Sequence, residues 1–194
     1  MEDADVISAL YAASEVGVTI DLIVRGFCRL RPGVAGLSER IHVRSIIGRF
    51  LEHARIFHFA NGHDDPVAGE FLIGSADWMV RNLSCRVETV TPVHDRGARE
   101  RLWEILSEGL SDHRQSWEMH SDGSYTRVGP DASDPGVQEV LMARAAPERP
   151  GLRCLMEDRP AHRQHRPQTA ALVRRRWGSR IPDKIEYGSI FRFV

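Results

Sequence analysis

Lysine is almost absent from this sequence, because Lys184 is the single lysine among 26 basic residues. A P-loop needs a lysine to reach the phosphates, so this class of nucleotide site is excluded. Cysteine is also scarce, and Cys28, Cys85 and Cys154 lie too far apart for a zinc pattern or a disulfide framework. We interpret all three as small buried hydrophobic residues.

Long apolar runs are missing as well. No stretch approaches the roughly 18 apolar residues that a membrane-spanning helix requires. The acidic start, Met1-Glu-Asp-Ala-Asp5, leads into no apolar segment of the kind found in signal peptides. We therefore predict a cytoplasmic protein without a membrane span.

The chain of 194 residues, 42% of them hydrophobic, suits one soluble domain of ordinary size. Its character changes near Gly129, beyond which proline and arginine dominate and hydrophobic periodicity is weak. We predict a folded domain over residues 1–128 and a Pro/Arg-rich tail over residues 129–194, with a short helix at 137–144. Disorder is favoured for the tail over a basic arm that binds polyphosphate or nucleic acid, and nucleic acid is an unlikely partner.

Residues 1–128 show the alternation of helices and strands that is typical of an α/β fold. A helix is predicted over residues 5–16, ending near Gly17, and an amphipathic helix over residues 95–110. Strands are predicted at residues 21–24, 55–59, 71–78 and 86–93, with a hairpin around Asp122-Gly123. A mixed sheet flanked by helices is therefore expected.

Arg25 stands at the carboxyl end of the first predicted strand, after the apolar run Leu22-Ile-Val24. Ligands of open α/β sheets bind at this position, and a guanidinium presents a fixed fork of donors to phosphate oxygens. From this residue alone, an arginine paired with a structural carboxylate is an equally good interpretation.

The segment 43–55 predicts a helix followed by a strand. Its apolar residues recur at helical spacing, which indicates a buried face: Val43, Ile46, Ile47, Phe50 and Leu51. His53 would then lie at or just past the helix C-terminus, where it could donate a proton or bind phosphate near neutral pH. A lone histidine is more often structural.

Asp77 and Arg86 follow further strand-like segments, so four separate elements end in or carry an Arg, a His or an Asp. If these side chains converge, they form a pocket for a polyanion. The cluster His63-Asp64-Asp65 invites a metal site, but a polar loop without a second ligand set is usually only a loop, and no metal ligand is predicted.

Several rare strings of this sequence closely resemble the last domain of the type 1 polyphosphate kinases, in the same order and at the same spacing. These strings are Leu22-Ile-Val-Arg-Gly26, Leu30-Arg-Pro-Gly33, Gly36-Leu-Ser-Glu39, Val43-Arg-Ser-Ile-Ile-Gly-Arg-Phe-Leu-Glu-His53, Gly74-Ser-Ala-Asp-Trp-Met79 and Arg81-Asn-Leu83. The resemblance covers roughly residues 1–128.

The resemblance implies a phospholipase D-like fold and an enzyme that moves phosphoryl groups between ATP and inorganic polyphosphate through a phosphohistidine. Arg25 matches a nucleotide-phosphate-binding arginine, His53 a histidine proposed as general acid or base, and Arg86 an arginine that lines the site. Mg²⁺ is expected for the complete enzyme, with ligands outside this chain. The His-x-Lys motif of true phospholipases D is absent, which argues against a phosphodiesterase.

The family's phosphorylated histidine lies in the preceding domain, and Met1 stands where the last domain begins. We therefore expect one half of a two-sided active site, inactive in isolation, and three alternatives remain. The chain could pair with a separate polypeptide that carries the missing domains, bind nucleotide or polyphosphate without chemistry, or be a non-functional remnant.

Overall fold

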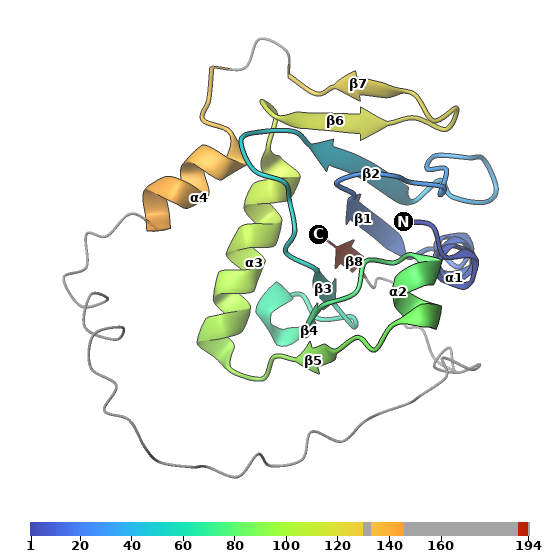
Figure 1. Ribbon diagram of the computed structural model, residues 1–194, viewed down its shortest axis with the longest axis horizontal. Coiled ribbons are helices and arrows are strands. Elements are labelled where there is room, and N and C mark those ends of the chain that lie inside the picture. The colour runs from blue at the N-terminus through green and yellow to red at the C-terminus, as the bar shows by residue number, and fades with distance from the viewer. Residues whose placement is uncertain (130–132, 146–189, 194) are drawn as a thin grey trace.

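The chain folds into a mixed β-sheet flanked by helices, as the sequence predicts. The computed structural model describes residues 1–129, 133–145 and 190–193 (Figure 1). The elements of these residues are α1 (Ala4–Glu15), β1 (Thr19–Ile23), β2 (Ile41–Ile46), β3 (Ile56–Phe59), the 3₁₀-helix η1 (Pro66–Ala68), β4 (Glu70–Gly74), α2 (Val80–Cys85), β5 (Val90–Pro92), α3 (Arg96–Ser111), β6 (Ser116–Met119), β7 (Tyr125–Arg127), α4 (Val137–Ala145) and β8 (Ile190–Phe193).

The strands of the described residues form one sheet in the order β5-β4-β3-β8-β1-β2-β6-β7. The three central strands, β8, β1 and β2, are parallel, while β3, β4 and β5 on one side and β6 and β7 on the other continue the sheet in antiparallel pairs. The carboxyl ends of β1, β2 and β4 therefore lie at the same edge as the starts of β3 and β5. We call this edge the carboxyl edge.

Helices cover both faces of the sheet (Figure 1). On one face, Leu10 of α1 packs with Ile20 and Leu22 of β1, which are almost fully buried. On the other face, Leu106 of α3 packs with Phe71 of β4. Because successive side chains of a strand point to opposite faces, β1 is buried on both sides, whereas β4 is anchored mainly by Phe71.

The start and stop signals in the sequence correctly place the two long helices. Asp3 caps α1 by accepting hydrogen bonds from the amides of Asp5 and Val6, and Gly17 ends it with φ of 96°. Asp95 caps α3 by accepting a hydrogen bond from the amide of Ala98. The predicted hairpin is also confirmed, as β6 and β7, and the short helix predicted at 137–144 is α4.

The helix predicted over residues 43–51 is wrong. Val43 and Ile46 belong to strand β2, while Ile47, Phe50 and Leu51 lie exposed in the loop that follows. Strand β2 pairs in parallel with β1, with Ile41 opposite Ile20 and Val43 opposite Leu22. This pairing lets the β-branched side chains pack against the sheet's buried face, so the tertiary context overrides the apparent helical spacing.

Two further expectations concern the strand at 86–93 and the tail. Only Val90–Pro92 form a strand, and Arg86 caps the C-terminal end of α2. Beyond residue 128, the described residues add α4, which packs on α3, and β8, which lies between β1 and β3. The disorder predicted for the tail 129–194 is therefore wrong for the residues of α4 and β8, which are ordered by packing on α3 and by pairing with β1 and β3. Residues 146–189 lie outside the described residues, and the boundary at 128 stays a prediction.

Among the helices that the structure describes, none combines the length and the apolar character needed to cross a membrane.

Candidate functional site

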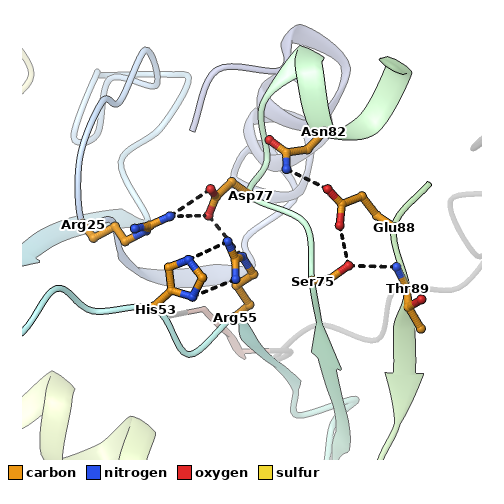
Figure 2. A network of polar contacts seen from close by, with 8 residues as sticks. All are labelled: Arg25, His53, Arg55, Ser75, Asp77, Asn82, Glu88 and Thr89. Carbon is orange, nitrogen blue, oxygen red and sulfur yellow. Dashed lines mark hydrogen bonds and ion pairs between the residues drawn. The ribbon is translucent and has the colours of Figure 1, made fainter. Parts of the chain in front are cut away.

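Polar side chains from three separate segments meet at the carboxyl edge of the sheet (Figure 2). Arg25 follows β1, Arg55 directly precedes β3, and Asp77 follows β4. These segments meet because β1 and β4 run in one direction while β3 runs in the other, with β8 between β1 and β3. The rigid strands behind the segments fix where their side chains project.

Asp77 is the centre of this cluster. Its carboxylate accepts hydrogen bonds from Nη2 of Arg25, at 3.1 Å to Oδ1 and 2.9 Å to Oδ2, and from Nε of Arg55, at 3.2 Å to Oδ1. The three side chains are mostly buried, with exposed fractions of 27% for Arg25, 17% for Arg55 and 21% for Asp77. One carboxylate thus holds two guanidinium groups together, and the cluster keeps a net positive charge.

The protonation of Asp77 follows from these contacts. Burial alone would raise the pKa of its carboxyl group, but hydrogen bonds from Arg25 and Arg55, together with their charges, outweigh burial and hold the pKa below its ordinary value. Asp77 is therefore ionised at neutral pH and can act only as an acceptor.

His53 is joined to the cluster through Arg55. Nη1 of Arg55 lies 2.9 Å from Nδ1 of the imidazole, and Nη2 lies 2.8 Å from Nε2. A guanidinium only donates, and a neutral imidazole has one acceptor nitrogen, so one of the two contacts at a time is a hydrogen bond. Arg55 has a φ of 50°, uncommon for a residue with a side chain, and strained backbone of this kind clusters at functional sites.

A second polar network lies beside the first, on the segments after β4 and before β5 (Figure 2). Glu88 accepts hydrogen bonds from the hydroxyl of Ser75 and, at 2.8 Å, from Nδ2 of Asn82. The hydroxyl of Ser75 in turn accepts a hydrogen bond from the amide of Thr89 at 3.0 Å. This network fixes the turn in which Asp77 lies two residues after Ser75.

The structure brings two of the three predicted site residues together. Arg25 and His53 belong to one cluster through Asp77 and Arg55, although His53 lies in a loop and not at the end of a helix. Arg86 is exposed on the segment between α2 and β5, within electrostatic range of Glu88, and is not a member of the hydrogen-bonded cluster.

Arg55 is the residue that sequence reasoning missed. The sequence-based prediction gives Arg55 no role in the site, whereas the structure shows that it contacts both His53 and Asp77. A signal was present, because Arg55 immediately precedes a predicted strand, and an antiparallel strand begins at the edge where its neighbours end. The alternative for Arg25, a paired arginine, also holds, but Asp77 engages only its Nη2 atom. Among the described residues, Nη1 and Nε of Arg25 remain available to a ligand.

A cavity of about 240 Å³ lies away from the cluster. Its lining includes Ile41 and His42 at the start of β2 and Met119 and His120 at the end of β6. It therefore opens at the edge of the sheet opposite the arginine cluster.

The fold and the cluster define a class of protein: an α/β domain whose carboxyl edge carries two arginines and a histidine grouped around one carboxylate. Comparison with known proteins gives the family. The model of the polyphosphate kinase C-terminal domain 2 matches residues 1–138. This chain belongs to the polyphosphate kinase C-terminal domain 2 family.

The relatives are similar over most of this chain. A polyphosphate kinase of Thermosynechococcus vestitus is 54% identical over 144 residues, which are 73% of this chain and 19% of that protein. One of Pseudomonas aeruginosa is 52% identical over 130 residues, 67% of this chain and 18% of that protein. The crystal structure of polyphosphate kinase from Porphyromonas gingivalis superimposes with a TM-score of 0.68 at 38% identity, covering 75% of this chain and 22% of that one. The chain thus spans about a fifth of the length of these relatives.

Proposed function

We propose that this domain supplies the phosphate-binding half of a polyphosphate kinase active site, with Arg25, Arg55 and His53 as its binding residues. One observation carries the proposal. Two arginines from different segments are held on a single carboxylate at the carboxyl edge of the sheet, with His53 beside them. The family membership points to ATP and inorganic polyphosphate as the ligands.

Phosphoryl transfer depends mostly on positioning and on neutralising the charge of the phosphate oxygens. The free Nη1 and Nε donors of Arg25 suit a bidentate contact to non-bridging oxygens. Arg55 adds a second fixed cation whose side chain is already ordered by Asp77, so little conformational entropy is lost when an anion binds. His53, the exposed member, is placed to exchange a proton with a phosphate oxygen at the attacking or leaving position.

Arg86 has a different part in this proposal. It is exposed and lies outside the cluster, so it does not contact the same oxygens as Arg25 in the present arrangement. An exposed cation on the neighbouring segment suits a chain of phosphates that extends away from the cluster. We infer that Arg86 guides polyphosphate toward or away from the site.

Magnesium does not fit the described residues. Over residues 1–129, 133–145 and 190–193, no group of three or more His, Cys, Asp or Glu side chains could hold a metal ion. The carboxylate at the centre of the site, Asp77, is already engaged by two arginines. A magnesium ion that accompanies ATP would take its protein ligands from elsewhere in the complete enzyme.

The resemblance places the phosphorylated histidine in another domain of the family, so we expect the 194-residue chain alone to bind phosphate compounds without making polyphosphate. Two of the alternatives agree with binding: a kinase assembled with a second chain and a binding module without chemistry. ATP-dependent polymer formation by the purified chain would contradict the expectation.

The test is calorimetric titration of the purified chain with Mg-ATP and with tripolyphosphate, beside an Arg25→Ala variant. Arg40→Ala is the matched control, because Arg40 is exposed and precedes β2 at the opposite edge of the sheet. We expect Arg25→Ala to weaken binding about tenfold or more, since a charged hydrogen bond contributes roughly 1.5–3 kcal/mol, and Arg40→Ala to leave it unchanged. Equal affinities of all three proteins would refute the site, and a folded wild-type chain that binds neither ligand would favour the remnant.

A further inference from the structure

The loop that carries His53 has little to hold it in place. This loop, residues 47–55, joins β2 to β3, and we call it the β2–β3 loop. Its large apolar side chains, Ile47, Phe50 and Leu51, are 63%, 51% and 67% exposed. Hydrophobic packing therefore contributes little to its position, although a site that binds phosphate needs its histidine within a fraction of an ångström.

The ends of the loop are tied to the sheet by backbone hydrogen bonds. The amide of Ile47 donates to the carbonyl of Gln115 at 2.9 Å, and the carbonyl of Arg55 accepts from the amide of Gly74 at 3.1 Å. These contacts fix where the loop begins and ends. They do not fix the backbone between Gly48 and His53.

Gln138 of α4 holds the middle of the loop. Its side-chain carbonyl accepts a hydrogen bond from the amide of Phe50 at 2.8 Å, and its side-chain nitrogen donates to the carbonyl of Phe50 at 2.7 Å. The same nitrogen donates to Oε1 of Glu52 at 2.7 Å. The amide thus pairs with the backbone of Phe50 as a neighbouring strand would, and also binds the residue before His53.

Gln138 is well placed to act as a fixed anchor. Gln138 is buried, with an exposed fraction of only 5%. The start of α4 is held by Asp112, which accepts hydrogen bonds from the amides of Val137 and Gln115 at 2.6 Å each. Val137 packs with Ile23 and Ile46, so α4 is seated directly on the strands that lead to the site.

Gly48 shows how closely the loop approaches this anchor. A Cβ atom on Gly48 would lie 2.5 Å from Oε1 of Gln138 and 2.6 Å from Nε2 of Gln115. A side chain on residue 48 would therefore displace the two side-chain amides from their present positions.

We propose that Gln138 is a positioning residue for His53: it fixes the β2–β3 loop so that the imidazole lies against Arg55 at the anion site. It acts through Phe50 and Glu52 and touches neither His53 nor a ligand. The effect on phosphate binding rests on the proposed function, whereas the effect on the position of His53 does not.

Gln138→Leu is the principal variant, because leucine fills a similar volume and makes no hydrogen bond. Arg144→Ala is the matched control. Arg144 also lies on α4 and pairs with Glu104 and Glu108 of α3, so its loss loosens α4 without removing a contact to the loop. Gln138→Glu is the second variant, since it keeps the acceptor for the Phe50 amide but places a carboxylate beside Glu52.

Two readouts on the full 194-residue chain follow the loop directly. Amide hydrogen exchange at Phe50 reports its bond to Gln138, and NMR shifts of the His53 ring report its environment. In Gln138→Leu we expect exchange at Phe50 to accelerate about tenfold and the His53 resonances to move. In Gln138→Glu the Phe50 amide should stay protected while the His53 resonances move, and in Arg144→Ala both should remain as in the wild type.

The outcomes separate this inference from the proposed function. Weaker tripolyphosphate binding by Gln138→Leu, with unchanged binding by Arg144→Ala, supports both. If His53 shifts in Gln138→Leu while the wild-type chain binds no phosphate compound, the positioning role stands and the proposed function fails. Unchanged His53 resonances in a folded Gln138→Leu protein, or equal shifts in Arg144→Ala, overturn the positioning role whatever the binding result.

Discussion

Two of the three segments that supply this site are loops at the same edge of the sheet, and they are held in different ways. The β4–α2 loop, residues 75–79, carries Asp77 and is fixed in part by residues close to it in sequence, Glu88 and Thr89. The β2–β3 loop carries His53 and Arg55, and its middle is held by Gln138, 88 positions away from Phe50. Only the first loop has anchors close to it in sequence, whereas the middle of the second depends on a distant helix.

The β4–α2 loop is also tied down by aromatic packing and by the chain's first residues. Trp78 stacks on Phe57 with ring centroids 5.2 Å apart and an interplanar angle of 8°. The carbonyl of Trp78 accepts hydrogen bonds from the amides of Glu2 and Asp3. We infer that Asp77 has a fixed position, and that its hydrogen bonds hold Arg25 and the β2–β3 loop in place beside it.

Asp77→Ala should have the largest effect on this arrangement. It removes the shared acceptor of Arg25 and Arg55 and leaves two partly buried guanidinium groups with like charges close together. We expect the free energy of unfolding to fall by about 2 kcal/mol, as for the loss of hydrogen bonds to a charged group. Urea denaturation measures this loss. An Asp77→Ala protein as stable as the wild type would show that Asp77 does not hold the two loops together.

Acid should weaken the link between the loops in a predictable pH range. The pKa of Asp77 is lower in the folded protein than its ordinary value of about 3.9. Its contribution to stability is therefore complete above about pH 3.9 and is lost as the pH falls through the folded pKa.

The measurement compares the unfolding free energies of the wild type and of Asp77→Asn from neutral pH to about pH 3. Other carboxylates titrate in both proteins, so their contributions cancel in the difference. The difference should stay constant at neutral pH and shrink below about pH 4. A difference that does not depend on pH would mean that the ionised carboxylate of Asp77 contributes nothing.

Glu88→Gln should have the smallest effect. Hydrogen bonds from Ser75 and Asn82 lower the pKa of Glu88, but its carboxylate is in contact with water, and glutamine keeps an acceptor oxygen for one of the two donors. We expect a small decrease in Tm, clearly less than that of Asp77→Ala, measured by thermal denaturation monitored by circular dichroism. A decrease as large as that of Asp77→Ala would show that Glu88, and not Asp77 or Trp78, is the main anchor of the β4–α2 loop.

The contrast between the loops also explains which predictions succeeded. The strand predicted from Phe71 is confirmed as β4, although it ends at Gly74 and not at Trp78, because its apolar run carries its own signal. The segment 43–55 was assigned to a helix, because short apolar runs fit both periodicities. What decides for a strand is the pairing of Ile41–Arg44 with Ile20–Ile23, which no local window contains.

The site residues, like the strands, were predictable only where a local pattern or the family resemblance marked them. Arg25 was found because it directly follows an apolar strand, where ligands of such sheets bind. His53 was found through the family resemblance, although the local structure predicted for it was wrong. Arg55 and Gln138 were not found, because an arginine before a strand and a glutamine in a short helix carry no local sign of their partners.

The sequence by itself determined the α/β character, the ends of the long helices, the hairpin and the family, since these depend on local patterns of apolar side chains, caps and turns. Only the tertiary structure decided that residues 41–46 form a strand, that Asp77 holds Arg25 and Arg55 together, and that Gln138 holds the loop of His53. Each of these depends on a hydrogen bond between residues far apart in the chain. Such a bond forms only after folding has brought the two segments together, so the local sequence pattern of neither segment indicates it.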